Sequence, residues 1–166
     1  MSMQVAASYK IPASATRVAA LLADPQFAEE TAGGAESAQA SVRHAPDGGF
    51  TLSLRRPVPA DDLPASVRVF TGGDLELRQA LVWQPAAPDG ARSATMAGEI
   101  VGAPVQLEGT VQLTPTADGC ELSIDGDIFA MVPLVGPTIE QAGATMVVEV
   151  LREQVEALTE RLADAP

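Results

Sequence analysis

The sequence predicts an α+β fold in which a curved antiparallel sheet of about seven strands wraps around one long C-terminal helix. Residues 3–10 and six later segments alternate apolar and polar side chains, as half-buried strands do. The connections between the later segments have hairpin length, which favours an antiparallel meander. Residues 133–163 carry the one sustained helical pattern, and a sheet with one buried face needs a partner of that length.

The chain opens with the strand 3–10, followed by two short helices that we expect within residues 14–31. Ser14 is a suitable N-cap for the first helix. Asp24-Pro25 breaks it, because proline cannot continue a helix from its interior, and residues 26–31 can form the second.

Six strands are expected within residues 36–130. The segments 47–49 and 118–119 contain the Asp-Gly dipeptide that is typical of tight hairpin turns. Near 61–71 the alternation stops and apolar residues recur at helical spacing, which predicts a helical excursion between two strands.

The expected long helix, 133–163, changes character along its length. Its second half is amphipathic, whereas its first half is apolar on nearly every side. One interpretation is that the first half is simply core. The other is that Ala142, Gly143 and Met146 border a cavity, with small residues leaving room and methionine adapting its shape. The two interpretations are compatible.

The inward face of the expected sheet is rich in small residues: Ala38, Ala40, Ala94, Gly98, Gly109 and Gly126. Either the helix approaches closely and fills this space, or the space stays open. Because the chain has only six aromatic residues (one Trp, one Tyr and four Phe), we expect a pocket. Its expected lining, with Phe70 at the mouth, is Phe50, Leu52, Leu77, Gln79, Trp83, Met96, Leu107, Ala142, Gly143 and Met146.

Gln79 interrupts the apolar register of its strand, and a buried amide must find hydrogen-bond partners. A neighbouring group or a water can satisfy it. Alternatively, Gln79 together with Tyr9 and His44 orients a ligand in an otherwise apolar cup. His44 lies next to a turn, so exposure is at least as well supported as burial.

No catalytic residues, no metal and no cofactor are expected. Acid–base catalysis needs groups within hydrogen-bond reach, and His44 is the single histidine. Asp125 and Asp127 fall on the outward parity of their strand. The single Cys120 is expected to be a buried, small apolar residue without a metal-type partner spacing.

A net charge of −12 argues against nucleic acid or an anionic membrane surface as a partner. The sequence shows no leader and no membrane-spanning run. We therefore expect one domain over residues 1–166, in a cytoplasmic protein that is a monomer or a homodimer.

Several short pieces, weak alone, resemble a known superfamily when taken in order. The pieces are Tyr9-Lys10-Ile11-Pro12, Val18, Leu21, Leu22, Asp24, Pro25 and Phe27; Val58-Pro59-Ala60, Leu63-Pro64, Phe70 and Gly73; Trp83; Gly109-Thr110; and Pro133-Leu134-Val135-Gly136 with Ile139-Glu140. They resemble the START-like (SRPBCC), helix-grip superfamily of polyketide cyclases, lipid-transfer domains and plant pathogenesis-related proteins, and within it a bacterial family of uncharacterised function. The resemblance implies a deep apolar cavity between sheet and helix, and it carries no catalytic residues across.

Three functions fit these observations. The first is a binding or carrier protein for a hydrophobic small molecule or lipid. The second is a cyclase- or dehydrase-type enzyme that acts on a hydrophobic intermediate in the same cavity, largely by positioning it. The third is a protein-interaction or regulatory module that uses the acidic surface or Val148 on the outer side of the long helix.

Overall fold

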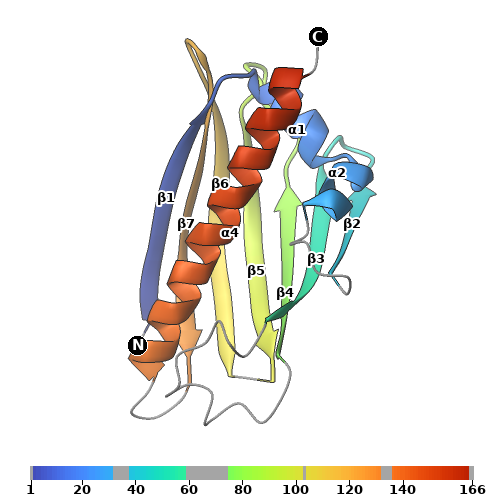
Figure 1. Ribbon diagram of the computed structural model, residues 1–166. Coiled ribbons are helices and arrows are strands. Elements are labelled where there is room, and N and C mark those ends of the chain that lie inside the picture. Colours follow the sequence, from blue (N-terminus) through green and yellow to red (C-terminus); the bar gives the residue numbers. More distant parts are fainter. Residues whose placement is uncertain (1, 32–37, 59–74, 103, 132–135, 165–166) are drawn as a thin grey trace.

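The computed structural model describes residues 2–31, 38–58, 75–102, 104–131 and 136–164. These residues form an α+β fold, with a curved seven-stranded antiparallel sheet and a long C-terminal helix on its concave face (Figure 1). The elements are β1 (Ser2–Ile11), α1 (Ala15–Leu22), α2 (Pro25–Glu30), β2 (Gln39–His44), β3 (Phe50–Val58), β4 (Leu75–Trp83), β5 (Arg92–Val101), β6 (Val105–Thr116), β7 (Gly119–Ala130) and α4 (Gly136–Asp164).

The predicted fold class and order of elements are confirmed. Strands β2 to β7 form the expected meander, and β1 pairs antiparallel with β7, giving the order β1-β7-β6-β5-β4-β3-β2. The helical excursion predicted near 61–71 lies outside the described residues, as does the predicted start of the long helix at 133–135.

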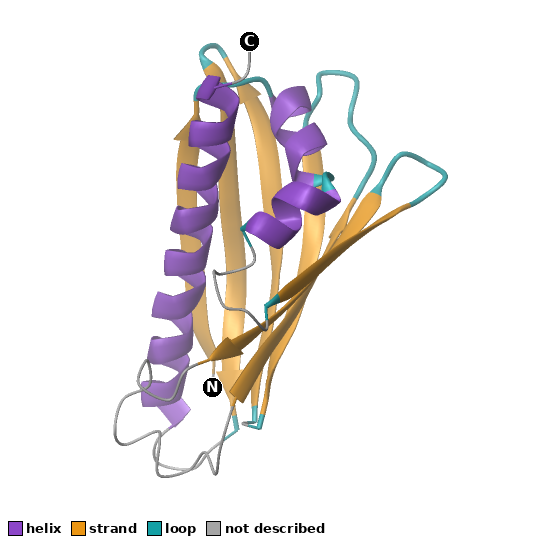
Figure 2. Ribbon diagram, turned by 45° about the vertical axis from the view of Figure 1, so that its right-hand side comes forward, coloured by secondary structure: helices purple, strands orange, loops and turns teal. Residues whose placement is uncertain are grey.

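The three helices of the described residues cover one face of the sheet, but they cover different parts of it (Figures 1 and 2). Helix α4 packs against β1 and β7 at one edge, whereas α2 packs against β2 at the other edge. The middle strands, β4 to β6, therefore lie below the space between α4 and the α1–α2 pair. This division of the concave face determines where the cavity forms.

Local sequence explains why α1 and α2 begin where they do. The Ser14 side chain accepts a hydrogen bond from the backbone N–H of Arg17 at 3.2 Å, as an N-cap does. The Asp24 carboxylate accepts one from the backbone N–H of Gln26 at 2.9 Å, and Pro25 takes the first helical position. The sequence predicted the N-cap of α1, whereas α2 begins at Pro25, one residue before the predicted start at Gln26.

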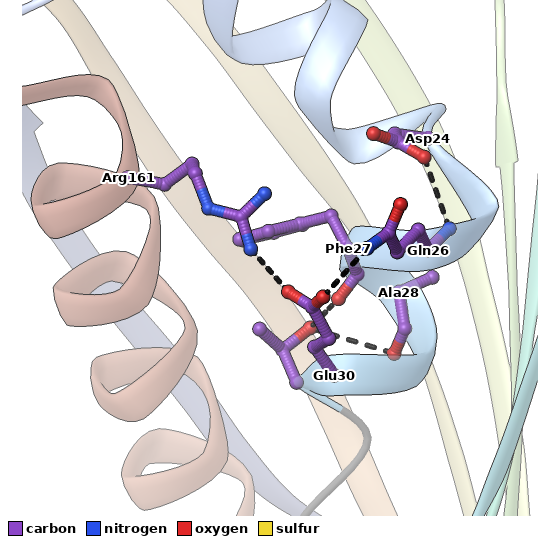
Figure 3. Close-up of polar contacts among 7 residues, drawn as sticks. Asp24, Gln26, Phe27, Ala28, Glu30 and Arg161 are labelled. Atoms are coloured by element: carbon purple, nitrogen blue, oxygen red, sulfur yellow. Dashed lines mark hydrogen bonds and ion pairs between the residues drawn. The ribbon is translucent and has the colours of Figure 1, made fainter. Parts of the chain in front are cut away.

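Side chains near the C-terminal end of α4 contact α2 (Figure 3). Arg161 forms an ion pair with Glu30, and its guanidinium lies 5.6 Å from the ring centroid of Phe27. Since both charged groups are exposed, the ion pair itself contributes little stability. Phe27, which is 2% exposed, contributes more through burial, and it anchors α2 to the core.

Cys120 is 0% exposed, which confirms the expectation of burial, and desolvation raises the pKa of its thiol. We expect the native protein to react with an aromatic disulfide reagent at least about a hundredfold more slowly than the urea-unfolded protein, because the reagent needs an accessible thiolate. Absorbance of the released thiol measures both rates. Fast reaction of the fully folded protein would contradict the burial.

Candidate functional site

An apolar cavity of about 100 Å³ lies between the concave face of the sheet and α4, with α1 and α2 at one end. Strands β2 to β7 and all three helices of the described residues contribute to its wall. Its apolar wall residues are Leu22, Phe27, Ala28, Ala40, Leu52, Leu54, Leu77, Leu81, Trp83, Met96, Ile100, Val105, Leu107, Val111, Leu122, Ile124, Ile128, Gly143, Met146, Val147, Val150 and Leu151. Its polar wall residues are Thr31, Gln79, Glu99, Gln106 and Gln154.

Eight of the residues that the sequence singled out for the pocket lie on this wall. They are Leu52, Leu77, Gln79, Trp83, Met96, Leu107, Gly143 and Met146. The structure thus brings together side chains of β3, β4, β5, β6 and α4 around one space. Phe70, which was expected at the mouth, lies outside the described residues.

Phe50 does not lie on the wall but behind it. It is 3% exposed and pairs across the β3–β4 ladder with Trp83, with ring centroids 6.0 Å apart and ring planes inclined by 19°. The alternation of side chains placed Phe50 correctly on the inner face, but it does not report how far along the strand the cavity extends. Phe50 therefore supports the Trp83 ring from outside the cavity.

Ala142 is half-buried on α4 and is likewise absent from the wall. Successive residues of a helix point about 100° apart, so the side that presents Gly143 to the cavity turns Ala142 away from it. Gly143, Met146, Val150 and Gln154 share the cavity-facing stripe at spacings of three and four residues.

The structure does not bring Tyr9 and His44 to the cavity. Tyr9 lies on the edge strand β1, half-buried and packed against the core below α4. His44 is exposed at the end of β2, with its ring tilted against Phe50 at 6.3 Å between centroids. Both share the inner parity of their strands, but they occupy the two edge strands, away from the middle strands that floor the cavity.

Gln79 is on the wall, where its amide makes a weak hydrogen bond. Its Nε2 donates to Sδ of Met96 at 2.9 Å, and a thioether sulfur is a poor acceptor. The residue lies opposite Gly98, which has no side chain to cover it. Gln79 therefore keeps hydrogen-bonding capacity toward the cavity.

Sequence reasoning missed the wall residues supplied by the helix pair and the distal part of α4. Phe27 and Ala28 reach the wall because α2 packs over β2, and Leu22 reaches it because α1 packs against β6, β7 and α4. No local pattern shows these tertiary arrangements. Gln154 was detectable, since it continues the stripe of Met146 and Val150 along α4.

Gly143 offers a test of how closely α4 approaches the sheet. A methyl group at this position would meet Ile128 at 3.4 Å (Cδ1) and 3.5 Å (Cγ2), which is ordinary van der Waals contact. We expect Gly143→Ala to raise the free energy of unfolding by about 0.5–1 kcal/mol, because alanine loses less backbone entropy in a helix. Urea unfolding followed by circular dichroism measures the change. A loss of stability would indicate that α4 lies closer to Ile128 than these contact distances imply.

A curved antiparallel sheet that grips a long C-terminal helix around an apolar cavity defines the START-like, helix-grip class of proteins. Within this class, the chain belongs to the family described as "Protein of unknown function (DUF2505)", whose family model matches residues 6–162. The predicted START-like, helix-grip fold and the prediction of a family with uncharacterised function are confirmed.

Solved structures share this fold along nearly the entire chain. The protein TTHA0849 of Thermus thermophilus superposes with a TM-score of 0.64 at 17% identity, over 98% of this chain and 100% of that one. The Zhui aromatase/cyclase of Streptomyces sp. R1128 gives 0.63 at 12% identity, over 97% and 93%. Norcoclaurine synthase from Thalictrum flavum, in complex with dopamine and hydroxybenzaldehyde, gives 0.60 at 14% identity, over 100% and 89%. At these identities the likeness establishes the fold alone.

Curated relatives are closer in sequence. The uncharacterized proteins Mb0491c of Mycobacterium bovis and Rv0481c of Mycobacterium tuberculosis are each 32% identical over 97 residues, which is 57% of this chain. The match spans 55% of the length of each relative, about half. Among the described residues, no helix has both the length and the apolar character needed to cross a membrane.

Proposed function

We propose that this protein binds a hydrophobic small molecule in its internal cavity, as a binding or carrier protein. The observation that carries the proposal is an apolar space of about 100 Å³ inside the core, where native proteins normally pack side chains to high density. At about 24 cal/mol per Å³, leaving this volume empty costs about 2 kcal/mol. A ligand that fills the space recovers that free energy.

The size of the cavity restricts what it holds. A cavity of about 150 Å³ accommodates benzene, and pockets for drug-sized ligands measure about 300–1,000 Å³. The cavity of about 100 Å³ is smaller than both, so one ring or a short acyl segment is the largest ligand that it suits, and such a ligand enters only with some movement of the wall. Norcoclaurine synthase, which has the same fold, is described in complex with dopamine and hydroxybenzaldehyde, both single-ring molecules.

Native mass spectrometry of protein purified from its own host tests the proposal. We expect a fraction of the protein to carry a bound apolar molecule, released on unfolding. Protein stripped of that molecule should bind single-ring aromatic compounds or short fatty acids, measured by calorimetry. Protein that is empty from its host and also ignores these compounds would contradict a binding function.

An enzyme of the cyclase or dehydrase type is the second candidate, and the names of the structural neighbours favour it. Among the wall residues of the described ranges, Glu99 is the only one with a charged side chain. Glu99 is an exposed residue. Acid–base catalysis would therefore depend on few groups, although positioning alone can accelerate a reaction. For this reason we place binding before catalysis.

The remaining features of the proposal concern partners and location. The net charge of −12 supports a role that involves neither nucleic acid nor an anionic membrane surface. A cytoplasmic monomer or homodimer stays our prediction, and sedimentation analysis measures the oligomeric state.

A further inference from the structure

We propose that the molecule held in the cavity carries a hydroxyl group on its apolar body, and that Oε1 of Gln79 accepts the hydrogen bond of this hydroxyl. This inference rests on the proposed function and specifies the ligand chemistry of the same site. It starts from the side-chain amide of Gln79, because this group interrupts the otherwise apolar inner face of β4.

The Gln79 amide lies on the cavity side of the sheet. Gln79 shares the inner parity of β4 with Leu77 and Leu81, and all three residues line the cavity. Its Nε2 lies 2.9 Å from Sδ of Met96, a residue of β5 that also lines the cavity and is 3% exposed. Since the side chain of Met96 lies on the inner face, this contact holds the amide above the same face.

The contact with Met96 also determines which end of the amide is available. A thioether sulfur accepts a hydrogen bond but has no hydrogen to donate, so the amide nitrogen faces the sulfur and Oε1 is directed away from it. Within the described part of the chain, no group donates a hydrogen bond to Oε1. Oε1 is also not a fully buried atom without a partner, a set in which the described residues place only Nε1 of Trp83. Oε1 of the half-buried Gln79 therefore has surface that a ligand atom can reach.

The strand neighbours of Gln79 offer no side-chain donor to Oε1. Its partners across the two ladders are Leu54 on β3, which is apolar, and Gly98 on β5, which has no side chain. A partly buried carbonyl oxygen in apolar surroundings loses hydration without compensation. A donor on the ligand would restore the missing hydrogen bond.

A water molecule is a weaker partner for Oε1 than a ligand hydroxyl. A water in a protein interior is held by about two to four polar groups, whereas the side chains around Gln79 supply only its own amide. A hydroxyl reproduces the bond that such a water makes, so its displacement loses little. The apolar body of the ligand is held by the wall and needs no further polar partner.

A hydroxyl also suits this acceptor better than a nitrogen donor does. An amino group brings two N–H donors, and the second would stay unpaired in the apolar space. A charged ammonium would lose its hydration, and the one charged wall residue of the described ranges, Glu99, is exposed on the outward parity of β5. We therefore assign the ligand a neutral O–H.

Phenol and toluene test the inference, because they have nearly the same shape and differ in replacing OH by CH₃. Any movement of the wall that admits a ring affects both compounds equally, so it cancels in the ratio of their affinities. We expect the ratio of phenol affinity to toluene affinity, measured by calorimetry, to be at least about fivefold higher in the wild type than in Gln79→Leu. Leucine continues the apolar register of β4, and we expect the variant to fold. Gln112→Leu, on the exposed outer face of β6, should keep the wild-type ratio.

A crystal structure of the wild-type protein with phenol supplies a second measurement. We expect the phenol oxygen to lie about 2.5–3.0 Å from Oε1 of Gln79, the distance of an O–H···O hydrogen bond. If Gln79→Leu fails to fold, this distance decides alone.

Each remaining outcome overturns the inference. If both compounds bind and Gln79→Leu keeps the wild-type ratio, the hydroxyl is not received by Gln79, while the proposed binding function stands. If the ratio falls in Gln154→Leu but not in Gln79→Leu, the amide on α4 receives the hydroxyl instead. If neither compound binds, the inference fails together with the proposed function.

Discussion

Replacing Gly119 by alanine is expected to lower the free energy of unfolding by about 3–5 kcal/mol, which is near the upper end for one substitution. Gly119 opens β7 with φ of +155°, outside the range that L side chains favour. A methyl group there would lie 2.2 Å from the carbonyl oxygen of Ile11 and 2.8 Å from the backbone nitrogen of Ala13. Because both obstacles are backbone atoms, the end of β1 must move away from β7.

Urea unfolding followed by circular dichroism measures this loss, and Gly48→Ala is its matched control. Gly48 also has positive φ, +96°, but a methyl group at Gly48 meets nothing within 4 Å. The control should therefore lose only the conformational cost, about 1–2 kcal/mol. Equal losses of unfolding free energy in the two variants would show that the close approach of β1 to Gly119 does not contribute to the cost of the Gly119→Ala substitution.

Gly119 also illustrates how far the sequence predicts the fold. Asp118-Gly119 was identifiable as a hairpin turn from composition alone, and the alternation of apolar residues predicted the strands on either side. Both signals depend only on residues that are close in the sequence, so they locate each strand and turn along the chain and thereby give the order of the elements. The contact of Gly119 with the end of β1 joins residues that are distant in the sequence, and only the folded sheet shows it.

The site was predicted in part for a related reason. Strand parity assigned Leu52, Leu77 and Trp83 to the inner face, and the small residues of that face suggested unfilled space. The alternation of side chains tells which face of the sheet a residue is on, but not which strand lies in the middle of the sheet and which at its edge. It therefore could not show that Tyr9 and His44 lie on edge strands, away from the cavity.

Buried charge is a further limit of sequence reasoning, as Glu140 shows. Glu140 lies in the first half of α4, is 3% exposed and accepts a hydrogen bond from the backbone N–H of Ala130 at 3.1 Å. This bond links the start of α4 to the end of β7. Helical periodicity cannot predict it, because the partner is a backbone group at the end of a strand.

Replacing Leu107 by tryptophan is expected to reduce the affinity for single-ring ligands at least about a hundredfold. Leu107 lies on the cavity wall in β6, and its partner on β5 is Gly98, which leaves room above the sheet for a larger ring. An indole in place of an isobutyl group would occupy much of the cavity of about 100 Å³. A ligand could then enter only by displacing packed side chains, which costs on the order of 1–3 kcal/mol in addition to its lost contacts.

Calorimetry with acetophenone measures the affinity, and urea unfolding shows whether the variant remains folded. Because the new ring fills existing space, we expect the free energy of unfolding to change by less than about 1 kcal/mol, unlike overpacking of a filled core. Gln112→Trp places the same side chain on the exposed outer face of β6 and should bind as the wild type does. A folded Leu107→Trp protein with undiminished affinity would mean that the ligand binds elsewhere, since an occupied cavity cannot hold two rings.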